Sequence, residues 1–286
     1  MRKITIAILA LIVVGLMIPT AFSSDANSIV VTYGETTNAN SNYKSIVNDF
    51  FTSQSNVNLK DANVKIITAS DVNKVSGSIT QKTYSSDQIF SCALVDMNGD
   101  GNINVKVDSS KITTITPKMY ASALKSAGIS QGNVYVTSPV EATGESALAG
   151  IMNSYEAATN TVIPEEVKQA ATDEITVQSE ILDNNQSDVN ADDLSDMVSD
   201  VKVVVQNGNI TNHNEIVNII KNYTVNNNIN ISDSDIENLA NTIEQVQSVS
   251  GQAGDYQDQI NNFVNNHSSG GFSLDGILNK IASIFG

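Results

Sequence analysis

Apolar and polar residues alternate with two different periods over the first half of the chain. A two-residue period marks strands at 28–34 and 63–70, and a helical period marks residues 42–54 between them. The same two patterns continue as strands at 90–97, 103–116 and 133–140 and as helices at 118–128 and 145–159. We therefore expect an α+β domain over residues 25–160, in which helices cover one mixed sheet of about five strands.

Strand patterns almost disappear after residue 160, where Pro164 opens a long helical pattern. Two later units resemble each other, because residues 210–223 and 231–246 each place an isoleucine before a Thr or Ser that suits a helix N-cap. They predict a helical hairpin. The fold class is thus α+β with an all-helical C-terminal region, and the helical domain spans residues 161–250.

The end of the chain divides into a polar part and an apolar part. Residues 251–271 have the composition of a polar, Gly-containing linker, and residues 272–286 predict an apolar C-terminal helix. This helix docks onto the helical domain, or it enters a membrane surface or a groove of a partner. Lys280 is its single cation, fewer than surface-lying helices favour. The apolar positions are Phe272, Leu274, Ile277, Leu278, Ile281, Ile284 and Phe285.

The start of the chain indicates the compartment. Two cations precede the apolar run of residues 4–18, and a proline and small residues follow, which is the pattern of a secretory signal peptide over residues 1–24. The run is shorter than the ~20 residues that span a bilayer, so we expect cleavage near Ser23 or Ser24 instead of a retained anchor. The mature protein is then secreted or in the cell envelope, outside the cytoplasmic membrane.

Charge and cysteine content narrow the range of partners. The chain carries 15 basic and 31 acidic residues, and its net charge of -16 becomes -18 once the leader and its two cations are removed. Nucleic acid and anionic lipid are disfavoured partners for such a surface. Cys92 is the one cysteine, which excludes an internal disulfide. Its apolar surroundings favour a core position over a reactive or intermolecular thiol.

Three blocks of sequence resemble one protein family: VVTYGETT at 30–37, the long block at 115–156, and INISDSDIENLANTIEQV at 229–246. Together they are similar to the secreted domain-of-unknown-function family 1002 of Gram-positive bacteria and methanogenic archaea. The likeness spans most of the mature chain and is most specific in the central block. It implies export and a two-part architecture, and it brings no activity, substrate or catalytic residue. The abundance of asparagine suits an archaeal relative.

The segment VDMNGDGNINVKVD, residues 95–108, has the clearest ligand pattern. Alternating side-chain oxygens precede Gly101 as in a calcium loop of the EF-hand type, but Val107 stands where such a loop has its last carboxylate. The flanking strand patterns and the Asn-Gly and Asp-Gly pairs favour a hairpin turn. Both interpretations stay open, and we expect no other cofactor. The candidate calcium ligands are Asp96, Asn98, Asp100, Asn102 and Asn104.

A second candidate is the strand-to-helix turn SPVEATGES at 138–146. Thr143 can cap the following helix, and the amides near Gly144 can receive an anion or a peptide carboxylate, although the turn contains no cation. The alternatives are a structural turn and a surface site that consists of Ser138, Glu141, Thr143 and Gly144.

Patterns for catalysis are weak. A Ser or Cys nucleophile needs a base, and both histidines, His213 and His267, lie in polar helical sequence without a motif. No His or Cys spacing suggests zinc. A hydrolase that attacks envelope polymers with paired carboxylates remains an alternative. The fold would have to gather acids such as Asp87, Asp96, Glu141 and Glu145.

N-glycosylation sequons occur only in the C-terminal half of the sequence. If the host glycosylates exported proteins, sugars would cover the helical domain. The acceptors are Asn185, Asn209, Asn222, Asn230 and Asn266.

The leading hypothesis is an exported, non-catalytic protein of the cell envelope or extracellular space that binds an envelope component or a surface protein. The sequence also permits the two-carboxylate hydrolase and a calcium-dependent adhesion module built on residues 95–108.

Overall fold

The computed structural model describes residues 28–75, 79, 82–98, 101–184 and 189–267. The predicted signal peptide at 1–24 and the predicted apolar helix at 272–286 lie outside these residues.

A mixed sheet of five strands forms the N-terminal half, as the apolar periods predicted. The strands lie in the order β2 (Asn63–Ile67), β1 (Ile29–Gly34), β3 (Cys92–Asp96), β5 (Gly132–Thr137) and β4 (Ile103–Val107). The pairs β1–β2 and β4–β5 are parallel, and β3 runs antiparallel to both of its neighbours. The sheet and the helical C-terminal region together confirm the α+β class.

The hairpin predicted between β3 and β4 is wrong, because β5 lies between these two strands. The chain does reverse its direction after β3, but it skips one strand position. Burial explains the order: β5 is buried along most of its length, whereas β4 is only partly buried and alternates with exposed positions. The strand that is apolar on both faces takes the inner place, and the amphipathic strand takes the edge.

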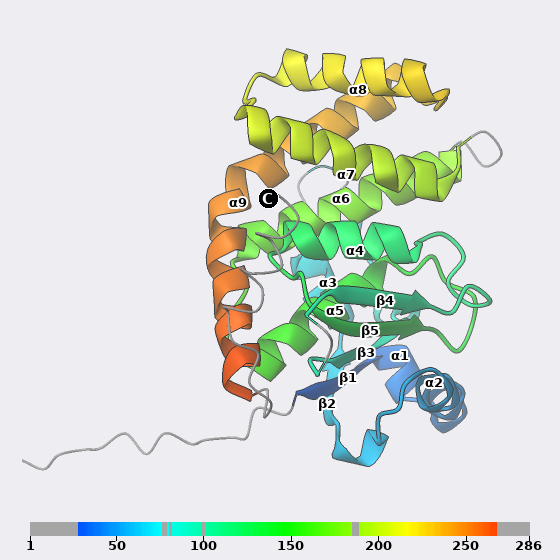
Figure 1. Ribbon diagram of the computed structural model, residues 1–286. Helices are drawn as coiled ribbons and strands as arrows, with labels where there is room; N and C mark the ends of the chain where they lie inside the picture. The colour runs from blue at the N-terminus through cyan, green and yellow to red at the C-terminus, as the bar shows by residue number, and fades with distance from the viewer. Residues whose placement is uncertain (1–27, 76–78, 80–81, 99–100, 185–188, 268–286) are drawn as a thin grey trace, which may run out of the picture.

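Helices cover both faces of the sheet (Figure 1). On one face, α4 (Pro117–Ser126) and α5 (Glu145–Thr159) share a core with β1, β3 and β5. On the other face, α2 (Ser41–Gln54) packs on a smaller core that includes Cys92, where burial raises the pKa of the thiol to about 12. The remaining short elements are α1 (Glu35–Asn38), α3 (Ala69–Lys74), η1 (Leu59–Asp61) and η2 (Ser86–Gln88).

Four helices follow the sheet: α6 (Glu165–Asn184), α7 (Ala191–Gly208), α8 (His213–Asn227) and α9 (Asp233–His267). They form a second core, and α6 and α9 also contribute side chains to the core that covers the sheet. The helical region is therefore joined to the sheet through two shared helices, with α9 running along the side of both in Figure 1. Among the described helices, none is long and apolar enough to cross a membrane.

The linker predicted over 251–271 is wrong for residues 251–267, which continue α9. Gly251 and Gly254 led to the prediction of a linker, because glycine is unfavourable inside a helix. Burial of regularly spaced side chains outweighs that cost. Those that enter the sheet core are Ala253, Tyr256, Ile260 and Phe263.

His213, the first residue of α8, connects that helix to α9. Its Nε2 lies 2.9 Å from a Glu237 oxygen, and its Nδ1 lies 3.2 Å from a Glu244 oxygen. The hydrogen bond to Glu237, with help from Glu244, raises the pKa of the imidazole above its ordinary value of 6.5. In its protonated form the ring therefore forms ion pairs that join the two helices.

Two glycines of contrasting environment test the packing of α9. Gly128, with φ of +75°, meets α9 so closely that an added Cβ would lie 2.1 Å from the Ala253 carbonyl oxygen, whereas a Cβ on Gly251 would meet nothing within 4 Å. We expect Gly128→Ala to cost at least about 2 kcal/mol in the free energy of unfolding. Gly251→Ala should add about 0.5–1 kcal/mol. Urea denaturation measures both, and a destabilising Gly251→Ala would show that α9 is not a regular helix there.

The His213 contacts predict a pH-dependent stability. Because folding raises the imidazole pKa, the stabilisation is complete below the ordinary value of 6.5 and is lost as the pH rises through the folded value. His213→Gln should therefore lower the Tm more at about pH 5.5 than at about pH 8.5. In a Glu237→Gln/Glu244→Gln background, the pH dependence of this loss should shrink. An equal loss at both pH values would contradict the ion pairs.

Candidate functional site

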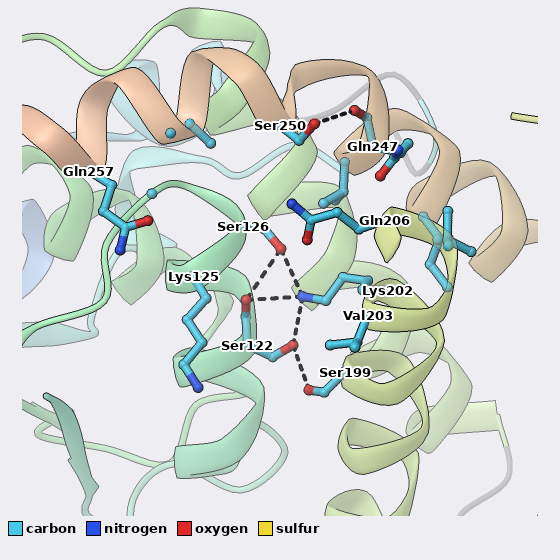
Figure 2. Close-up of a pocket in the computed structure, with 16 residues that line it drawn as sticks. Ser122, Lys125, Ser126, Ser199, Lys202, Val203, Gln206, Gln247, Ser250 and Gln257 are labelled. Atoms are coloured by element: carbon cyan, nitrogen blue, oxygen red, sulfur yellow. Dashed lines mark hydrogen bonds between the residues drawn. The ribbon is translucent and has the colours of Figure 1, made fainter. Parts of the chain in front are cut away.

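A pocket of about 350 Å³ lies where the end of α4, the outer part of α7 and the middle of α9 meet (Figure 2). Its volume is at the small end of the roughly 300–1,000 Å³ usual for small-molecule sites. Serine hydroxyls, glutamine carboxamides and two lysines supply its polar groups. Its apolar wall consists of Val203, Val205, Ile243, Val246 and Ala253.

Local sequence signals place α4 at this pocket. Thr116 accepts a hydrogen bond from the Met119 amide at the helix start, and Pro117 occupies the first turn, where its missing N–H costs nothing. Gly128 then takes the left-handed conformation just after the helix. Because this glycine has no side chain, α9 approaches α4 backbone to backbone at Ala253.

A buried ion pair forms the floor of the pocket. Glu174 of α6 is 1% exposed, and its carboxylate lies 2.7 Å from the ammonium of Lys202 on α7. The hydroxyls of Ser122 and Ser126, one turn apart on α4, each donate to this carboxylate at 2.6 Å. Both oxygens of Glu174 are thus hydrogen-bonded, which offsets the cost of burying the charge.

Lys202 also hydrogen-bonds to both serines, as the dashed lines of Figure 2 show. Its Nζ lies 2.9 Å from the Ser122 hydroxyl and 2.8 Å from the Ser126 hydroxyl. A serine beside a lysine is also the pairing of some hydrolases, in which the amine removes the hydroxyl proton. Here both serines donate to Glu174 and the lysine donates to the same carboxylate, so the arrangement is a closed hydrogen-bond network.

Other polar groups of the pocket have no protein partner in the described part of the chain. These are the carboxamides of Gln206 on α7 and Gln247 on α9, and the ammonium of Lys125 on α4. Figure 2 shows Gln206 extending across the space above Ser126 and Lys202. The floor is therefore internally satisfied, and the upper part offers donors and acceptors to a ligand.

The proposed calcium ligands lie along one turn and the adjoining strands. Asp96 ends β3, and its Oδ1 accepts hydrogen bonds from the amide and the side chain of Asn98 at 2.9 and 2.8 Å. Asn104 is on β4, where its side chain lies 3.4 Å from Asn133, and Asn102 comes just before that strand. Asp100 lies outside the described residues, within which no group of three or more His, Cys, Asp or Glu side chains could hold a metal. Calcium binding stays a prediction.

The turn at 138–146 differs from its predicted form. The N-cap of α5 is Gly144, with φ of +105°, and not Thr143. The Thr143 carbonyl instead accepts a hydrogen bond from the Ile115 amide, so this residue belongs to the pairing of two extended segments. Ser138 and Gly144 are buried and Glu141 is exposed. The four predicted residues therefore do not share one exposed surface.

Glu145 is the buried acid of this region. The Lys82 ammonium lies 2.6 and 2.8 Å from its two oxygens, and the Tyr84 hydroxyl donates to it. Burial and the Glu145 charge raise the pKa of Tyr84, and burial also raises the pKa of the nearby Glu180 carboxyl. This cluster fastens the segment at 82–84 to the first turn of α5.

The acids considered for a hydrolase come from three parts of the chain, since Glu141 and Glu145 belong to the same turn. Asp87 is in η2, Asp96 ends β3, Glu141 follows β5 and Glu145 begins α5. The glycosylation acceptors Asn209, Asn222 and Asn230 are exposed, as an attached sugar requires. Asn185 and the side chain of Asn266 lie outside the description, and glycosylation stays a prediction.

Comparison with known proteins agrees with the resemblance in the sequence. A family model described as "Protein of unknown function (DUF1002)" matches residues 33–263. The chain belongs to this family. The "Uncharacterized protein YpuA" of Bacillus subtilis (strain 168) is 28% identical over 307 aligned positions, which cover 100% of both chains. No solved structure matches with significance. The pocket, at 122–257, lies within the matched part.

Sequence reasoning missed the pocket of this family member. Ser122 and Ser126 are four residues apart, so they lie on the same side of α4, and this spacing was the one local signal. Glu174 and Lys202 each occur in an amphipathic helix among other charges, and nothing local distinguishes them from solvated residues.

Two lysines join α4 and α7, and we expect their removal to lower the free energy of unfolding by very different amounts. Lys202→Met leaves Glu174 buried without a cation and should cost about 3–5 kcal/mol in the free energy of unfolding. Lys118 pairs with Asp196 at 2.7 Å, but the two side chains are 48% and 53% exposed. Lys118→Met should therefore cost at most about 1 kcal/mol.

Urea denaturation of both variants and of Lys202→Met/Glu174→Leu measures these costs. The double variant should recover part of the loss, since it removes the unpaired carboxylate. Equal costs for the two lysine variants would contradict a buried ion pair at the floor.

Proposed function

We propose that the protein is an exported, non-catalytic binding protein that recognises a component of the cell envelope or a surface partner through the pocket between α4, α7 and α9. The observation that carries this proposal is the division of the pocket. Its charged floor is held by protein groups, while the carboxamides of Gln206 and Gln247 and, at the edge of the pocket, the exposed ammonium of Lys125 have no protein partner among the described residues.

The chemistry of the floor supports binding over catalysis. A general base or nucleophile must exchange a proton during each turnover. The Ser122 and Ser126 protons are directed to Glu174, and Lys202 donates to the same carboxylate. Proton removal from this network would leave charge unbalanced in a buried place, so the network favours a fixed binding surface.

The sequence at both ends of the chain supports a location outside the cytoplasm, and the net charge bears on the kind of partner. The cationic start, the apolar run of residues 4–18 and the following small residues have the pattern of an export signal. A net charge of -16 disfavours nucleic acid as a partner. The apolar residues at 272–286 offer a means of membrane contact that would keep the pocket near the cell surface.

Two glycines of α9 give a matched test. Gly254 lines the pocket and Gly251 does not, and an added Cβ would meet nothing within 4 Å at either position. Gly254→Leu therefore fills the pocket, whereas Gly251→Leu adds the same side chain elsewhere on the same helix. We expect the chain without its leader, and its Gly251→Leu variant, to cosediment with envelope material of the source organism. Gly254→Leu should reduce this binding by about tenfold or more.

Circular dichroism and Tm establish that both variants are folded. Equal cosedimentation of the two variants would place the binding site outside the pocket. If the unsubstituted chain did not bind envelope material, the proposed function would be wrong.

A further inference from the structure

The charged residues that line the pocket are both cations. Lys125 and Lys202 line it, and among the described residues no Asp or Glu does, although acids outnumber bases 31 to 15 in the chain. Glu174 below the floor balances the charge of Lys202 and leaves Lys125 unbalanced. The pocket therefore favours a ligand that carries a negative group and opposes a cationic one.

The uncharged polar groups suit a peptide. Gln206 and Gln247 each present an amide oxygen and an amide NH₂, so each can both accept and donate a hydrogen bond. A peptide group also has one donor and one acceptor, so its N–H can pair with a glutamine oxygen and its C=O with a glutamine NH₂. A simple carboxylate such as acetate has acceptors only and would leave the glutamine oxygens without a donor.

The apolar wall restricts the side chains of such a ligand. Valine, isoleucine and alanine form it, and no aromatic residue lines the pocket in the described part of the chain. The volume of about 350 Å³ corresponds to roughly ten water molecules, which leaves space for two or three small residues and not for a long chain. Short aliphatic side chains fit both the wall and the volume.

From these three features we infer that the pocket binds the free carboxylate end of a short peptide with small aliphatic side chains. Lys125, an exposed residue at the edge of the pocket, reaches the carboxylate with its long side chain. Gln206 and Gln247 pair with the peptide groups, and the accessible side chains of Val203 and Val246 contact those of the ligand. This inference rests on the proposed function and names its ligand class.

Isothermal titration of the folded chain without its leader tests the ligand class with three probes. They are acetyl-Ala-Ala as the free acid, the same dipeptide as its C-terminal amide, and sodium acetate. We expect the free acid to bind about tenfold more tightly than the amide, because one close ion pair near the protein surface supplies a factor of that size. Acetate should bind more weakly than either dipeptide.

Single substitutions assign the contacts. Lys125→Gln should bring the affinity of the free acid down to that of the amide and leave the amide unchanged. Lys118→Gln is the control, since Lys118 lies on the same helix but does not line the pocket. Gln206→Ala should weaken both dipeptides about equally, by roughly fivefold. Gly254→Leu should abolish binding of both, and Gly251→Leu should leave it intact.

Each outcome separates this inference from the proposed function. Equal binding of acid and amide, or a ratio unchanged in Lys125→Gln, would overturn the carboxylate assignment. Acetate as tight as the free acid would reduce the site to one for simple anions. If no dipeptide binds while cosedimentation with envelope still depends on Gly254, the ligand class is wrong and the proposed function stands. Dipeptide binding without any envelope binding would keep the ligand class and overturn the envelope role.

Discussion

One buried carboxylate constrains the helical half of the molecule. Glu174 is 1% exposed. An unpaired charge in that position would destabilise the fold by several kcal/mol, which is comparable to the total free energy of unfolding of a small domain. The fold must therefore bring it the ammonium of Lys202 from α7 and two hydroxyls from α4. These contacts fix three helices relative to one another. The pocket is the space that remains where α9 packs across them.

Local signals were sufficient for much of the fold. The apolar period of residues 28–34 predicted β1, and Pro117 and Gly128 marked the two ends of α4. Local signals did not predict the strand order, in which β5 lies between β3 and β4. This order follows from the greater burial of β5, and that burial depends on the helices that cover both faces of the sheet. Helix α9 was missed beyond residue 250 for a related reason. Its glycines lower the local helix propensity, and the helix is stabilised by side chains that it buries in the core of the sheet.

The candidate site was harder to predict than the fold. Its floor joins residues 28 and 80 positions apart in sequence, and each of them looks like an ordinary surface residue of its own helix. The segments that did stand out in the sequence were turns. Asp96 and Asn98 bond to each other, and Gly144 begins a helix, so their residue types are explained in part by backbone geometry. Turns and cation sites use the same residue types, Asp, Asn and Gly, so sequence alone does not separate them.

The core that covers the sheet contains Val30 near one end of the described chain and Phe263 near the other. A core that joins residues so distant in sequence forms only after a large loss of chain entropy, and such cores tend to slow folding. While the polypeptide is being made, the sheet strands emerge long before the α9 residues that cover them. Until that helix arrives, part of the sheet core remains open to water. Folding is therefore completed by the last described helix, and the chain is expected to become native as one unit instead of sheet first and helices later.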